Sequence, residues 1–287
     1  MTLKFGWLLR PLRISSTRWS IEPLPDHQSR IDVVTRSVDS DGEWYWPPRD
    51  DARPARPRNW FALPETHLLT VSGCDPAEGE RLAEFIVSAL GFVFAQELLP
   101  EGWGHLTRVR INSESPQDFD PNDDALVRIL DRAVTWWLTA PNLRDRFFGV
   151  FRWHAASFAG QHDHEIFAGQ YMVLDACWRI HEELGRAGTK KIPHAARISA
   201  LATAYALKPP DNWQLNSGSS PFVTIRNELF HEAKWGGKPI GFGFPASPNH
   251  APHLELYWFN ARLILALLGE TSDYIRSPIV WQTYSLE

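Results

Sequence analysis

Apolar and polar residues follow different patterns in the two parts of this chain. Before about residue 140, short apolar runs are separated by Pro, Gly, Asp and Ser, a pattern that is typical of strands joined by turns. We expect strands in five of these runs: Phe5–Leu12, Arg30–Val38, Glu43–Trp46, Trp60–Val71 and Leu106–Ile111. The segment Pro47–Arg58 contains four prolines and four arginines, and we expect it to be a loop.

Two helices are also expected in this first part. Asp75-Pro-Ala-Glu78 offers an N-cap residue, a proline at the first helical position and an acid in the first turn. The helix that follows, to about Leu99, carries apolar residues at helical spacing: Leu82, Phe85, Ile86, Ala89, Leu90 and Val93. A second helix is expected from about Pro121 to Leu138.

After Pro141 the strand signals nearly vanish and helical periodicity takes over. We expect five helices there: Leu143–Ser157, His164–Leu184, Pro193–Leu207, Pro221–Trp235 and Leu254–Gly269. Gly185 and the pair Gly236-Gly237 fall where helix C-caps belong. The pattern therefore predicts an α+β protein, with a mixed, strand-rich N-terminal domain over residues 1–140 and an all-α domain of four to five helices over residues 141–287.

Composition agrees with a globular chain of about two domains. The chain has 287 residues, of which 44% are apolar and 22% are charged. Its two cysteines are too few for a disulfide framework or a thiolate zinc site. No run of about 18 apolar residues is present, and the N-terminus lacks the features of a signal peptide. We expect a cytoplasmic protein with no membrane partner.

Charge is spread unevenly along the chain. The net charge is −5, but the segment Arg186–Lys238 holds eight basic and three acidic residues and so carries +5. A local positive field of this kind suits the binding of phosphate groups, while the alternative is an ordinary solvated surface. The candidate RNA-binding residues of this region are Lys190, Lys191, Arg197, Lys234 and Lys238.

The expected helix Pro221–Trp235 carries the most informative residues. Arg226 and His231 lie about 140° apart around its axis, and the long arginine side chain can lean toward the histidine. Asn227 lies on the same face as His231, one turn before it. A permanent cation that grips phosphate and a ring that titrates near neutral pH suit RNA cleavage without a metal. The alternative is an ordinary surface pair.

The segment Arg226-Asn-Glu-Leu-Phe-His231 resembles the Arg-x4–6-His signature of the HEPN superfamily, in which a polar residue commonly follows the arginine. His164–Leu184 is similar to the first long HEPN helix, whose middle often carries an acid, here Asp175. Lys190–Leu207 resembles the second helix, and Leu254–Leu268 resembles the closing one. The ApeA-like HEPN group is the nearest subfamily, and the resemblance covers about residues 145–270.

This resemblance implies a metal-independent endoribonuclease that leaves 2′,3′-cyclic phosphate and 5′-hydroxyl ends. His231 would withdraw the 2′-hydroxyl proton while its counterpart in a second subunit protonates the leaving oxygen, and Arg226 would stabilise the phosphorane. Asn227 and Asp175 are candidates to orient Arg226 or His231. The resemblance also implies a homodimer, no cofactor and no metal. Its setting would be a prokaryotic anti-phage defence or toxin-like system, whose N-terminal domain senses a trigger or docks a partner.

Three alternatives stay open at this point. In the first, the C-terminal domain is a non-catalytic HEPN module for interaction or RNA binding. In the second, the protein senses a ligand through the aromatic run Trp44-Tyr-Trp46. Metal ligands are the third possibility: His162-Asp-His164-Glu165, with His154, or the separate pair His250 and His253. The competing interpretation of the first of these segments is the start of a helix, with Asp163 as its N-cap.

Overall fold

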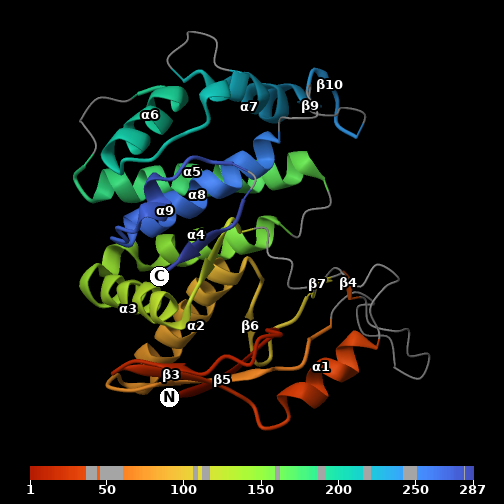
Figure 1. The fold of residues 1–287 in the computed structure, drawn as a ribbon, viewed down its shortest axis with the longest axis vertical. Helices are drawn as coiled ribbons and strands as arrows, with labels where there is room; N and C mark the ends of the chain where they lie inside the picture. Colours follow the sequence, from red (N-terminus) through yellow and green to blue (C-terminus); the bar gives the residue numbers. More distant parts are fainter. Residues whose placement is uncertain are drawn as a thin grey trace. The chain divides into compact units, whose positions relative to one another are not determined.

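The computed structural model describes residues 1–36, 44–45, 61–105, 109–111, 117–158, 162–186, 192–215, 221–241, 251–280 and 282–287. These residues form two compact units, Met1–Ser115 and Pro116–Glu287. The first unit is rich in strands and the second is mainly helical, so the predicted α+β class is confirmed (Figure 1). Among the described residues, no helix is both long enough and apolar enough to cross a membrane.

The first unit is built on a five-stranded sheet with the order β2-β3-β5-β1-β6. Its strands are β1 (Thr2–Gly6), β2 (Ile14–Ser15), β3 (Trp19–Pro23), β5 (His67–Val71) and β6 (Leu99–Pro100). All the pairings are antiparallel, and Thr70 of β5 lies opposite both Thr2 and Ser20. Along β5 the buried residues alternate with half-buried ones, as expected for a strand with one face against a core.

Helix α2 (Pro76–Phe94) packs against β1 and β5 of this sheet. Its start is as predicted, because the backbone N–H of Glu78 donates to the Asp75 carboxylate at 3.1 Å and Pro76 occupies the first turn. All six predicted apolar positions are buried. The helix ends at Phe94, before the predicted Leu99, because Leu99–Pro100 pairs with β1 as β6.

The predicted strand Arg30–Val38 is wrong. Residues 30–35 belong to helix α1 (His27–Thr35). Ile31 and Val34 lie on one side of this helix and are buried in a cluster that also contains Trp7, Phe61 and Val109. The expected strands at Glu43–Trp46 and Leu106–Ile111 are found in part, as β4 (Trp44–Tyr45) paired with β7 (Val109–Arg110). The expected loop Pro47–Arg58 lies outside the described residues.

The second unit contains all five helices predicted after Pro141. Helices α5 and α8 run side by side, and α4 contacts both of them, so that these three form the centre of the unit (Figure 1). Thirteen of the sixteen residues of α8 are buried, as expected for a helix packed on most of its sides. The helices of the unit are α3 (Asp123–Thr139), α4 (Arg144–Ser157), α5 (Asp163–Glu183), α6 (His194–Ala204), α7 (Pro221–Glu232), α8 (Pro252–Leu267) and α9 (Asp273–Arg276), with 3-10 turns at Pro141–Leu143 and Asp211–Trp213.

Two features of this unit differ from the sequence prediction. The units divide between Ser115 and Pro116, earlier than residue 140, so that α3 belongs to the helical unit. The unit is also not all-α, because β8 (Phe119–Pro121) pairs in parallel with β11 (Tyr284–Leu286), and β9 (Lys234–Trp235) pairs with β10 (Lys238–Pro239).

The glycines predicted as helix caps have different roles. Gly185, at φ +67°, follows the end of α5, and its N–H donates to the carbonyl of Glu182, as expected for a C-terminal cap. Gly236 and Gly237, at φ +59° and +75°, instead form the two-residue turn of the β9–β10 hairpin. Two successive positive φ angles match a type I′ turn, which twists in the same sense as the paired strands.

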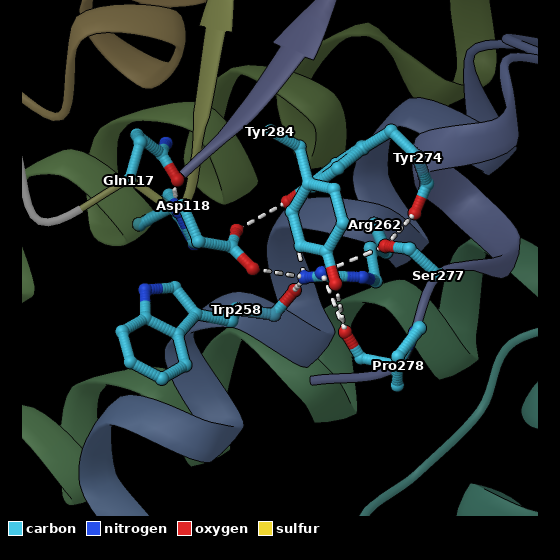
Figure 2. A network of polar contacts seen from close by, with 9 residues as sticks. Gln117, Asp118, Trp258, Arg262, Tyr274, Ser277, Pro278 and Tyr284 are labelled. Carbon is cyan, nitrogen blue, oxygen red and sulfur yellow. Dashed lines mark hydrogen bonds and ion pairs between the residues drawn. The ribbon is translucent and has the colours of Figure 1, made fainter. Parts of the chain in front are cut away.

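An ion pair between Asp118 and Arg262 is buried in the second unit (Figure 2). The guanidinium Nη1 lies 2.7 Å from the Asp118 Oδ2, and the two side chains are 2% exposed or less. Tyr274 donates its hydroxyl to the same carboxylate at 2.5 Å. Arg262 also donates to the Trp258 carbonyl and to the Ser277 hydroxyl. The contacts tie residues next to β8 and after α9 to the central helix α8.

Candidate functional site

Helix α7 is anchored at its N-terminal end by Phe222. This ring is buried and stacks on Trp213 at 4.3 Å and packs against Phe167 of α5 at 5.3 Å between ring centroids. Farther along α7, Ile225 and Leu229 are half-buried. The aromatic anchor therefore fixes one end of α7 on α5 and leaves its C-terminal turn, with His231, exposed.

Arg226 and His231 meet on the surface of α7. The Arg226 Nη1 lies 2.7 Å from the His231 Nε2 and donates at 3.0 Å to the Asn227 Oδ1. His231 and Asn227 are exposed and Arg226 is half-buried. A guanidinium only donates, so Nε2 of His231 is the acceptor and the proton of a neutral ring lies on Nδ1. The arginine leans to the histidine as expected from the sequence, and both groups can reach a ligand.

Tyr171 of α5 lies beside the Arg226 guanidinium. The guanidinium carbon lies 5.6 Å from the centre of the Tyr171 ring and 5.4 Å from that of Phe230. Burial raises the pKa of Tyr171 to about 12, so the hydroxyl is neutral at physiological pH. The Tyr171 hydroxyl and the Arg226 Nε are both buried, and the neighbouring guanidinium lowers the pKa of Tyr171 against the larger effect of burial. Arg226 therefore contacts the rings of Tyr171 and Phe230, and its Nη1 contacts Asn227 and His231.

Asp175, one turn after Tyr171 on α5, was expected to orient Arg226 or His231. It instead contacts two residues of the first turn of α6: Arg197 Nη1 donates to its Oδ1 at 3.3 Å, and His194 Nδ1 lies 3.6 Å from the same oxygen. Within the described residues, Asp175 has no hydrogen bond or ion pair with Arg226 or His231. The acid predicted for the middle of this helix therefore orients α6 residues.

His194 adds a titratable ring that the sequence prediction missed. Its ring lies 5.8 Å from that of Tyr171, so Tyr171 contacts both His194 and Arg226. Burial lowers the pKa of His194, Arg197 and Arg226 lower it further, and Asp175 opposes them. The sequence feature that points to His194 is its position directly after Pro193, at the start of a helix within the basic segment.

The predicted RNA-binding residues are only partly assembled around this site. Arg197 belongs to the cluster through Asp175. Lys234 and Lys238 lie on the β9–β10 hairpin that follows α7, and Lys234 pairs with Glu232 at 2.7 Å. Lys190 and Lys191 lie outside the described residues. The cluster that α5, α6 and α7 bring together consists of Tyr171, Asp175, His194, Arg197, Arg226, Asn227 and His231, hereafter the Arg–His cluster.

The histidines considered as metal ligands do not converge. His154 is fully buried, contacts Gln117 and Gln170, and burial lowers its pKa to about 3. His162 and His164 stack on each other at 5.4 Å, and His162 rather than Asp163 is the N-cap of α5. Within the described part of the chain, no three His, Cys, Asp or Glu side chains are placed to hold a metal ion. His253 pairs with Asp163 at 3.5 Å, while His250 lies outside the described residues.

The aromatic run proposed for ligand sensing is described only in part. Trp44 and Tyr45 form β4, and the Tyr45 ring packs against Phe61 at 5.6 Å between centroids. Trp46 lies outside the described residues. The described ring of this run thus contributes to the packing of the first unit.

Comparison with family models, curated proteins and solved structures found no match to this chain. The Arg–His cluster contains two guanidinium groups, two imidazole rings and an exposed amide from three helices. Guanidinium groups bind phosphate, and imidazole transfers protons near neutral pH. The arrangement suits a phosphodiester better than it suits a metal or an apolar ligand.

Proposed function

We propose that this protein is a metal-independent endoribonuclease in which Arg226 and His231 act on one phosphodiester of RNA. The observation that supports this most strongly is the 2.7 Å contact between the two side chains on an exposed helix face. A group that binds phosphate and a group that transfers protons therefore lie within reach of the same phosphate. The resemblance of Arg226-Asn-Glu-Leu-Phe-His231 to the HEPN signature supports the same activity.

In the proposed reaction, the 2′-oxygen of a ribose attacks the adjacent phosphorus and displaces the 5′-oxygen of the next nucleotide. Arg226 turns from His231 to the phosphate and stabilises the charge that builds on the phosphorane oxygens. His231 transfers one of the two protons that the reaction moves. The products carry a 2′,3′-cyclic phosphate and a 5′-hydroxyl. DNA is not cleaved by this route because it lacks the 2′-hydroxyl.

The proposal includes the oligomer and the biological setting that the HEPN resemblance implies. Two protomers would associate through their helical units, so that the α7 surfaces of both act on one RNA. Arg197, Lys234 and Lys238 would contact neighbouring phosphates. In a prokaryotic anti-phage defence or toxin-like system, the first unit would sense the trigger or dock a partner.

Replacement of either central residue is expected to abolish RNA cleavage without unfolding the protein. In EDTA, with a 5′-labelled RNA of mixed sequence, Arg226→Ala should lose about 100-fold or more of the cleavage rate, because the phosphorane loses its cation. His231→Ala should lose about 100-fold or more, because a proton transfer loses its carrier. Gel analysis of the labelled fragments measures both rates.

Arg179→Ala is the matched control, since Arg179 is an exposed arginine of the same unit that pairs with Glu182. It should cleave at the wild-type rate. Equal cleavage by the wild type and both central variants would contradict the proposal. A wild type that binds RNA through Arg226 but leaves it intact would favour the non-catalytic RNA-binding module instead.

A further inference from the structure

His194 lies in the Arg–His cluster but has no role in the reaction described so far. It occupies the first turn of α6, and its side chain is 32% exposed, so a ligand can reach the ring. The positive end of the α6 dipole lies at the same place and favours an anion next to this ring. His194 is linked to Arg226 through Tyr171, whose ring contacts both side chains.

Three contacts define the surroundings of the His194 ring. The Asp175 carboxylate lies 3.6 Å from Nδ1 and favours the tautomer with its proton on that atom. The lone pair of Nε2 is then available to accept a proton. The centre of the Tyr171 ring lies 5.8 Å from that of His194 and 5.6 Å from the guanidinium carbon of Arg226. Tyr171 thus contacts both His194 and the proposed phosphate-binding arginine.

We propose that His194 is a second catalytic residue of this site, which takes the 2′-hydroxyl proton while His231 of the same chain returns a proton to the leaving 5′-oxygen. This inference rests on the proposed function. It replaces the second subunit as the source of the other proton-transfer group.

The step is balanced without any further reactant. The 2′-oxygen forms its bond to phosphorus as its proton passes to the Nε2 of His194. The bond from phosphorus to the 5′-oxygen breaks as that oxygen receives a proton from the protonated ring of His231. The enzyme is left with His194 protonated and His231 neutral, and proton exchange with water restores both.

The charges around His194 favour the role of a base. The described groups that face the ring are Asp175 and Tyr171 from α5, Arg197 from its own helix and Arg226 from α7. Burial and the two arginines lower the pKa of His194 despite Asp175, so more of the ring is neutral at physiological pH. Activity should accordingly rise with pH as His194 loses its proton.

Two substrates distinguish a base from an acid. The first is an RNA dinucleotide, whose 5′-alkoxide leaving group needs a proton. The second is uridine 3′-(4-nitrophenyl phosphate), whose nitrophenolate leaves without one. His194→Ala should lose about 100-fold or more of kcat/KM on both substrates. His231→Ala should lose as much on the dinucleotide but less than about 10-fold on the activated ester.

The pH profile of kcat/KM is a second test, because a His194 with a purely structural role would leave the shape of this profile unchanged. On the dinucleotide, His194→Ala should lose the acidic limb of the kcat/KM profile. His194→Gln, which keeps a polar residue at the start of α6, should behave as His194→Ala, and thermal unfolding should show both variants folded. His164→Ala, an unrelated histidine of α5, is the control and should match the wild type.

The outcomes separate this inference from the proposed function. If His194→Ala and His194→Gln keep within about 3-fold of wild-type cleavage while Arg226→Ala and His231→Ala lose it, His194 is not catalytic and the ribonuclease proposal stands. If the His194 variants cleave the activated ester at close to the wild-type rate, the assignment of His194 as the base is wrong. If none of the four variants loses activity, both proposals fail.

Discussion

Asp118→Ala is expected to destabilise the second unit by about 3–5 kcal/mol, because it leaves the buried guanidinium of Arg262 without its counter-charge. Arg262 is fully buried, and Asp118 is its ion-pair partner at 2.7 Å. The change also removes the acceptor of the Tyr274 hydroxyl. Chemical denaturation of the full chain, followed by far-UV circular dichroism, measures the free energy of unfolding.

Asp120→Ala provides the control for this prediction. Asp120 is an exposed acid two residues further along on β8, so its loss should change the free energy of unfolding by less than about 0.5 kcal/mol. Equal stabilities of the two variants would show that the Asp118–Arg262 pair does not hold residues next to β8 on α8. A larger loss in Asp120→Ala would contradict the placement of these side chains.

Acidification is expected to destabilise the second unit through His154. Burial lowers the pKa of this ring to about 3 in the folded protein, against about 6.5 in an unfolded chain. Between these values the unfolded state binds a proton that the folded state does not, so stability is lost as the pH falls. The slope approaches about 1.4 kcal/mol per pH unit, and it vanishes below about pH 3, where both states are protonated.

His154→Gln should remove this part of the pH dependence. Glutamine does not titrate and can still form hydrogen bonds with Gln117 and Gln170, which contact the ring nitrogens of His154. The variant should be less stable at pH 7 and should lose less stability between pH 7 and pH 5 than the wild type. His67, whose pKa burial lowers to about 4, contributes to both proteins alike. Parallel stability curves for the two proteins would contradict the account.

Local patterns were sufficient to predict most helices and the central pair of the site. The N-cap and proline of Asp75-Pro76 mark the start of α2, because capping depends on neighbouring residues. Arg226 and His231 lie five residues apart on one helix, so helical geometry alone indicates that a long side chain can join them. Contacts between residues only a few positions apart can therefore be predicted from the local sequence.

Other features depend on contacts between distant residues. The short apolar run at Arg30–Val38 does not distinguish a strand from a helix, and the burial of Ile31 and Val34 against Trp7 decides it. Asp118 and Arg262 lie far apart in the sequence, and nothing near either residue predicts their pairing. The HEPN resemblance predicts that Asp175 orients Arg226 or His231, but the packing of α5 against α6 places it against His194 and Arg197.

The chemistry of the RNA ends tests the central claim most directly. The purified protein is incubated in EDTA with an RNA oligonucleotide and with a matched oligonucleotide that carries 2′-deoxyribose throughout, and mass spectrometry identifies the products. Cleavage by Arg226 and His231 without a metal predicts 2′,3′-cyclic phosphate and 5′-hydroxyl ends from the RNA and an intact deoxy oligonucleotide. Cleavage of the deoxy strand, or 3′-hydroxyl and 5′-phosphate ends that form only when a divalent metal is added, would contradict it.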